Sequence, residues 1–99
     1  MNMQQMIAQA QKMQRELRKA KEALYEKEFT SSKGGLVSVV MMGNKEIKSI
    51  NIDKDALEPD NKEMIEEMIA SCVNELIEKI EDEEAELEER ITGQRGIGF

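Results

Sequence analysis

The stretch "EFTSSKGGLVSVVMMGNKEIKSINID", residues 28–53, decides the fold of this 99-residue chain. Short runs of Phe, Val, Ile and Thr are broken by glycines, a pattern that predicts β-strands joined by tight turns. We predict three strands, at residues 28–33, 35–42 and 45–52. Gly34-Gly35 separates the first two. Gly43-Asn44 separates the last two and suits a two-residue primed hairpin turn, so the segment predicts an antiparallel meander.

Alternation within the strands predicts which side chains enter the core. Residues on one face of the middle strand are apolar, and so are those on its other face, Leu36, Val40 and Met42, which places this strand at the centre of the sheet. In the third strand, Ile50 and Ile52 point one way. Ile47 falls outside that alternation, and the sequence does not decide whether a β-bulge lies there. The expected core residues of the sheet are Val37, Val39, Ile50 and Ile52.

The segment before the sheet carries a heptad stripe. Its apolar residues recur at steps of three and four, at Met3, Met6, Ala10, Met13, Leu17, Ala20 and Leu24. This spacing predicts a long amphipathic helix that runs to about Lys27. Asn2 and Gln5 form a capping-box pair at its start, and Met1 and Met6 occupy the positions of a hydrophobic staple.

A second long helix is expected to begin near residue 60, after the sheet. Pro59 fits the first helical position, and an alternative start uses Asp60 as the cap with Glu63 as its partner. The first half of this helix has a wide apolar stripe that would cover the sheet, with Cys72, Val73, Leu76 and Ile77 buried. The second half, "EKIEDEEAELEER", is strongly acidic. The tail, residues 93–99, is glycine-rich and is expected to be mobile.

These elements predict a single α+β domain over residues 1–99: a long N-terminal helix, a three-stranded antiparallel meander and a long C-terminal helix. Only 39% of the residues are apolar and 35% are charged, so the core is small for a chain of this length. A three-stranded sheet also leaves two edges that invite a partner. We therefore expect the fold to be completed as a homodimer.

Composition argues against several functional classes. The chain has no histidine and one cysteine, which excludes His–Cys zinc sites, Ser–His–Asp and Cys–His catalysis, and an internal disulfide. No pair of carboxylates stands out from the acidic background. We therefore expect no enzyme activity, no cofactor, no metal and no small-molecule substrate. No apolar run reaches the roughly 20 residues of a membrane span, and the first residues lack the pattern of a signal peptide, so a cytoplasmic location is expected.

Charge is distributed unevenly along the chain, whose net charge is −7. Residues 1–21 hold five bases and one acid, whereas residues 53–90 hold sixteen acids and four bases. On a heptad wheel, four of the five bases lie opposite the apolar stripe and one, Lys21, flanks it. We predict a DNA-binding surface formed by Lys12, Arg15, Arg18, Lys19 and Lys21.

Two other interpretations of this basic face remain open. A charged helix face is often only solvated. Alternatively, attraction between these bases and the acids at residues 78–86 sets the register of the two helices. If both helices leave the same side of the sheet and run antiparallel, Leu17 lies near Ile80 and Ala10 near Leu87.

The opening "MNMQQMIAQAQKMQRELRKAKEAL", residues 1–24, closely resembles that of the YbaB/EbfC family of bacterial nucleoid-associated proteins. "GGLVSVVMMGNKEIKSINID", residues 34–53, is similar to the family's glycine-bounded core, and "LEPDNKEMIEEMI" with the "VNE" after it is similar to the segment that follows. The resemblance covers nearly the whole chain. It implies a small cytoplasmic homodimer whose helices project like tweezer arms and bind duplex DNA in the nucleoid, without catalysis or metal.

Two functions from different classes follow. The first is a dimeric DNA-binding nucleoid protein that contacts the duplex backbone through the basic helix face and affects nucleoid organisation and gene regulation. The second is a coiled-coil adaptor or prefoldin-like holdase with no nucleic-acid role. The three heptads of the first helix are fewer than a prefoldin arm needs.

Overall fold

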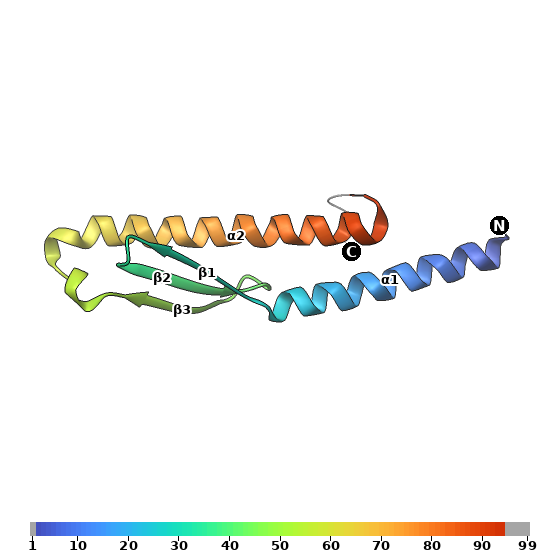
Figure 1. Cartoon of the computed structure of the whole chain (residues 1–99), viewed down its shortest axis with the longest axis horizontal. Helices are drawn as coiled ribbons and strands as arrows, with labels where there is room; N and C mark the ends of the chain where they lie inside the picture. Colours follow the sequence, from blue (N-terminus) through green and yellow to red (C-terminus); the bar gives the residue numbers. More distant parts are fainter. Residues whose placement is uncertain (1, 95–99) are drawn as a thin grey trace.

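The computed structural model describes residues 2–94 and shows an elongated molecule, 69 × 19 × 16 Å. One long helix packs over a small sheet, and the other, the first in the chain, projects from the end of the sheet (Figure 1). The α+β class and the predicted order of helix, three strands and helix are confirmed. In chain order the elements are α1 (Met3–Glu26), β1 (Glu28–Lys33), β2 (Val37–Met42), β3 (Ile47–Ile52), two 3₁₀ turns (Lys54–Ala56 and Pro59–Asn61) and α2 (Lys62–Thr92).

The sheet is an antiparallel meander in the order β1-β2-β3, so the central position of β2 is confirmed. A register shift between Val40 and Met41 pairs Met41 with Ile47, which accounts for the broken alternation in β3. The predicted two-residue turn is wrong. The loop holds Gly43, Asn44 and Lys45, with Lys45 in the left-handed region at φ 72°. The Lys45 amide donates to the Met42 carbonyl oxygen at 2.7 Å and closes this loop.

Local signals set the ends of both helices. The predicted capping box is confirmed: the Asn2 side chain accepts from the Gln5 amide at 2.8 Å, and the Gln5 side chain accepts from the Asn2 amide at 3.3 Å. The staple on Met1 lies outside the described residues. Pro59 takes the first position of the 3₁₀ turn that directly precedes α2, which itself begins at Lys62. At its other end α2 stops at Thr92, and the C-cap Gly93 has a φ of 78°.

The core lies between α2 and the first two strands. Its buried apolar residues are Leu17, Leu24, Phe29, Val37, Val39, Met41, Ala56, Ile65, Cys72, Leu76, Ile80 and Leu87. The predicted burial of Cys72 and Leu76 is confirmed, whereas Val73 and Ile77 are half-buried. The prediction for Ile50 is wrong, because this side chain is 45% exposed. The reason is geometric: α2 packs over β1 and β2 and leaves β3 largely uncovered.

Polar contacts tie β1 to the side of α2. Glu75 accepts hydrogen bonds from the Ser31 hydroxyl, at 3.1 Å, and from the Lys33 ammonium. The bond from Lys33, followed by that from Ser31, lowers the pKa of the Glu75 carboxyl. Glu75 thus lies on the side of α2 that faces β1, and this exposed contact adds modestly to the packing of the buried apolar face.

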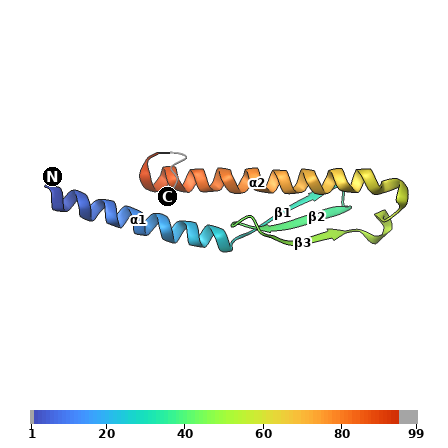
Figure 2. The ribbon, with the colours of Figure 1, turned by 180° about the vertical axis from the view of Figure 1, so that it is seen from behind.

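Only the second half of α1 contacts α2. Leu17 and Leu24 are buried, whereas residues 3–16 are all exposed and extend past the end of α2 (Figures 1 and 2). The predicted helix register is wrong by about three turns, because Lys21 meets Glu88 rather than the middle of α2. The cause is that the first half of α2 spans the sheet, so α1, which leaves from the end of the sheet, reaches only the last turns of α2.

Gly43 sits against the last turn of α1. A Cβ built on it would lie 1.8 Å from the carbonyl oxygen of Leu24 and 3.2 Å from the Cα of Tyr25. The Gly43 amide donates to the Lys27 carbonyl oxygen at 2.8 Å, which holds the two segments at this separation. The β2–β3 loop therefore supports the base of α1 only because residue 43 has no side chain.

Gly43→Ala is expected to destabilise the protein by about 1–3 kcal/mol, the usual cost of overpacking a tight site, because backbone atoms must move to admit the methyl group. The measurement is the urea midpoint at fixed protein concentration. Asn51→Ala, an exposed change on β3, serves as the control and should leave the midpoint within about 0.5 kcal/mol of the parent. An unchanged midpoint for Gly43→Ala would contradict the close approach.

Candidate nucleic-acid interface

Four of the five predicted DNA-binding residues stand together on the exposed part of α1. Lys12, Arg15, Arg18 and Lys19 are all exposed. Lys12 lies 4.0 Å from Glu16 on the same helix, a distant and solvent-exposed pair that contributes little energy. The other three make no ion pair within residues 2–94. They therefore form a local cluster of positive charge, which we call the basic face.

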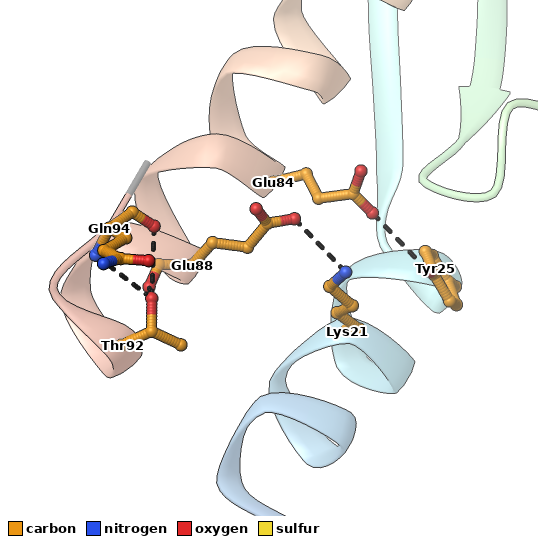
Figure 3. A network of polar contacts seen from close by, with 6 residues as sticks. All are labelled: Lys21, Tyr25, Glu84, Glu88, Thr92 and Gln94. Atoms are coloured by element: carbon orange, nitrogen blue, oxygen red, sulfur yellow. Dashed lines mark hydrogen bonds and ion pairs between the residues drawn. The ribbon is translucent and has the colours of Figure 1, made fainter. Parts of the chain in front are cut away.

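Lys21, the fifth predicted residue, is placed differently. Its ammonium lies 3.2 Å from Glu88 of α2, and the two side chains are only 11% and 6% exposed. Figure 3 shows the pair pointing toward one another across the contact between the helices. Lys21 therefore belongs to the contact between the helices and does not lie on the basic face. Its heptad position beside the apolar stripe is compatible with this placement.

The ion pair is part of a small polar network that sequence reasoning missed (Figure 3). The Tyr25 hydroxyl donates to Glu84 at 3.4 Å, and the Thr92 hydroxyl donates to the backbone carbonyl of Glu88 at 2.6 Å. The Oε2 atom of Glu88 is buried without a hydrogen-bond partner among residues 2–94. One sequence signal was available: Glu84 is an acid at a heptad position of α2 where an apolar residue is expected. Its partner can be identified only once the register of the two helices is known.

The lysines of the sheet region are paired with acids. Lys27 contacts Glu83 at 3.1 Å, and Lys45 contacts Glu81 at 3.2 Å. The remaining pairs of this kind are Lys33–Glu75, Lys48–Glu28 and Lys62–Glu66. The exposed cations outside the basic face that make no ion pair within residues 2–94 are Lys54, Lys79 and Arg90, which are spread along the molecule. The basic face is therefore the one place in the described chain where such cations gather.

This arrangement suits contact with an anionic backbone. Within residues 2–94 there is no group of three or more acidic or cysteine side chains placed to hold a metal ion. In the same range, no helix has the length and apolar character needed to cross a bilayer. Cys72 is fully buried, which removes the one thiol from reaction at the surface.

Comparison with known proteins points the same way. A sequence model described as "YbaB/EbfC DNA-binding family" matches residues 1–95. A nucleoid-associated protein of Clostridium novyi is 40% identical over 94 residues, which is 94% of this chain and 82% of the relative. One of Enterococcus faecalis is 39% identical, over 97% of this chain and 94% of the relative. An uncharacterized protein of Helicobacter pylori has a solved structure with a TM-score of 0.73 and 27% identity, covering 88% of this chain and 92% of the other.

Lys21→Met is expected to destabilise the protein by about 3–5 kcal/mol, because it leaves the Glu88 carboxylate buried without a counter-charge. The double variant Lys21→Met, Glu88→Met should recover most of that loss, since well-packed apolar residues can replace a buried pair. Urea unfolding at fixed concentration measures both. Lys19→Met, which removes an exposed cation from the same helix, is the matched control and should change the stability by less than about 0.5 kcal/mol. A single variant as stable as the control would rule out this role of the pair.

Proposed function

We propose that this chain, which belongs to the YbaB/EbfC DNA-binding family, binds duplex DNA as a homodimer through the basic face of α1. The observation that carries the proposal is the gathering of Arg15, Arg18 and Lys19, exposed and without ion pairs within residues 2–94, while the lysines of the sheet region are paired. The names of the relatives support a place in the nucleoid. Organisation of DNA there, with effects on gene expression, is the role we assign.

The physical basis is the release of counterions. Lys and Arg side chains that neutralise phosphates release condensed cations from the duplex, and this term does not depend on base sequence. Lys12 and Lys19 are seven residues apart, about 10 Å along a helix, so the basic face of one chain reaches one or two phosphates. Backbone contact without strong sequence preference is therefore expected.

The acidity of the whole chain does not forbid this contact. A net charge of −7 opposes approach to DNA at long range. Screening limits that repulsion to about 8–10 Å near physiological ionic strength. Within the basic face, Lys12 and Arg15 belong to residues 3–16, which extend past the end of α2 (Figure 1), so at contact these cations act on the phosphates first.

The homodimer in this proposal is supported by uncovered apolar surface. Met3, Met6, Ile7 and Met13 are all more than one third exposed on the projecting part of α1. Both outer strands of the sheet also have open edges. A second copy would cover these surfaces and would double the number of cations facing DNA.

DNA affinity should fall steeply with salt. If the side chains of a dimer engage about two to four phosphates, the logarithm of the association constant should decline with the logarithm of salt at a slope near −2 to −4. The measurement is fluorescence anisotropy of a labelled duplex across a salt series, with unrelated duplex sequences run in parallel. A slope near zero would show that the phosphates are not the ligand.

The triple variant Lys12→Glu, Arg15→Glu, Lys19→Glu should reduce DNA affinity by at least about 100-fold at low salt, because it replaces attraction by repulsion at the phosphates. The matched control is Lys54→Glu, Lys79→Glu, Arg90→Glu. It changes the net charge equally at cations that lie away from the basic face. Both variants should unfold at urea midpoints near the parent, since the altered side chains are exposed.

Three results separate the interpretations of the basic face. Loss of binding in the first triple variant alone supports the proposal. Equal loss in both variants would mean that net charge, and not the basic face, governs affinity. Unchanged binding in both, or a parent that does not bind at about 50 mM salt, would leave the basic face as a solvated surface and would favour the adaptor function.

A further inference from the structure

A cavity of about 280 Å³ opens beside the second half of α1. Within residues 2–94 its lining residues are Gln14, Leu17, Arg18, Lys21 and Tyr25. They recur three and four residues apart, so they share one face of the helix. Lys21 and Tyr25 also contact Glu88 and Glu84 of α2 (Figure 3). The cavity, which we call the α1 cavity, therefore lies at the contact between the two helices.

The base of the α1 cavity is apolar. Leu17 is only 2% exposed, and the side chain of Tyr25, which is 39% exposed, stands at the end nearest the sheet. The volume is close to the lower bound of about 300 Å³ for small-molecule sites, which are typically apolar with a few polar groups. A tyrosine ring favours a flat aromatic partner, in an offset or edge-to-face arrangement. The cavity therefore suits the apolar body of a small ligand.

Two cations line the α1 cavity, and their charges are compensated to different degrees. The Lys21 ammonium lies 3.2 Å from Glu88, so much of its charge is balanced within the fold. Arg18 is exposed and makes no ion pair within residues 2–94. Side chains three residues apart are neighbours on a helix surface. An anion held between Arg18 and Lys21 would gain charge-assisted hydrogen bonds from the guanidinium and from the remaining N–H groups of the ammonium.

Arg18 is the residue that the α1 cavity shares with the basic face. Lys12, Arg15 and Lys19 lie outside the lining. On a helical wheel the lining residues fall between the apolar stripe and the basic face, and Arg18 stands at the boundary with the basic face. A ligand in the cavity would therefore engage one of the cations that we assign to DNA.

The two halves of the cavity point to one class of ligand. A phosphate of DNA would satisfy Arg18, but it has no apolar part that would cover Leu17 and the Tyr25 ring. A neutral apolar compound would cover these groups and leave the arginine without a partner. A ligand that joins an anionic group to a flat apolar body would satisfy both halves at once.

We propose that the α1 cavity binds a small organic anion with a flat apolar body, such as an aromatic carboxylate, and that this ligand competes with DNA for Arg18. The carboxylate lies between Arg18 and Lys21, and the body covers Leu17 beside the Tyr25 ring. The ligand site stands on the cavity itself. Its effect on DNA rests on the proposed function of the basic face.

Three probes separate the parts of the ligand. Naphthalene-2-carboxylate carries both the anion and the apolar body, naphthalene-2-carboxamide carries the body alone, and acetate carries the anion alone. The carboxylate should bind with a dissociation constant on the order of 1 mM or tighter, as expected for a ligand of its size. The carboxamide should bind at least about ten-fold more weakly, and acetate should not bind in the same range. Shifts of the Leu17, Arg18 and Lys21 backbone amides in two-dimensional NMR spectra measure the binding without DNA.

Two variants test the site, and one serves as the matched control. Arg18→Gln removes the uncompensated cation and should weaken the carboxylate about ten-fold. Gln14→Phe leaves the charges unchanged and places a ring at the exposed rim, so it should block both naphthalene compounds. Lys19→Gln removes one exposed cation of the same helix outside the lining and should bind the carboxylate like the parent. Circular dichroism checks that all three variants keep the fold.

Competition with DNA is measured in a separate titration. Saturating naphthalene-2-carboxylate should weaken binding of a labelled duplex about five- to ten-fold at 0.1 M salt, the effect of removing about one phosphate contact. Sodium chloride at matched ionic strength and the carboxamide are the controls. By linkage, DNA should weaken the binding of the carboxylate by the same factor. The Arg18→Gln variant should bind DNA more weakly than the parent and should lose this response to the carboxylate.

Several results would overturn the ligand site. They are a parent that does not bind the carboxylate, equal binding of the carboxylate and the carboxamide, acetate that binds as tightly as the carboxylate, and undiminished binding to Arg18→Gln. An equal loss in Lys19→Gln would show a response to net charge and would overturn it too. Binding of the carboxylate to a parent that fails to bind DNA would support the site and contradict the proposed function. A carboxylate that binds without weakening DNA binding would overturn the competition for Arg18.

Discussion

The approach of the β2–β3 loop to the base of α1 is the constraint on which the rest of the molecule depends. With no side chain at residue 43, the loop backbone touches the last turn of the helix, and the Lys21–Glu88 pair then holds the helix against α2. These two contacts fix where α1 leaves the sheet and its alignment on α2. Because the first half of α2 packs on the sheet, only its last turns contact α1. The first fourteen residues of α1 therefore extend past the end of α2. The position of Lys12 and Arg15 beyond α2 follows from this geometry.

Much of this architecture could be predicted from local patterns. Four of the signals act over a few residues each, and the structure agrees with them. They are the heptad spacing, the Asn2–Gln5 capping box, Pro59 and the glycine-bounded strands. Apart from the β2–β3 turn, in which Lys45 joins Gly43 and Asn44, the failures concern relations between distant elements. The side of Ile50 was predicted correctly from its alternation, but its burial depends on how many strands one helix can cover. Likewise, the place of Lys21 depended on a helix register that the spacing of apolar residues leaves undefined, since each heptad looks like the next.

Charge is organised at two levels in this chain. In the sheet region, acids of α2 are matched with lysines such as Lys27 and Lys45, which contribute modestly to stability as exposed pairs but neutralise much local potential. Lys12 and Arg15 stand apart from those acids because residues 3–16 extend past the end of α2. A sequence with the same net charge, but with α1 shifted by three turns along α2, would place residues 3–16 beside the acids of α2. The electrostatic character of the basic face is therefore a product of helix alignment as much as of composition.

In the proposed homodimer, α1 serves two partners through opposite faces. The apolar stripe of residues 3–16 meets a second copy, and the basic face meets phosphate. A helix segment as short as residues 3–16 is marginal in water without packing, so covering its apolar stripe also orders the cations. A ligand that binds the ordered form must in turn stabilise the dimer. Salt then acts in two opposed ways. It weakens phosphate contact by reducing the gain from counterion release, yet it screens the repulsion between two chains that each carry −7. Self-association should therefore tolerate salt that releases DNA, and the two equilibria can be separated in one titration.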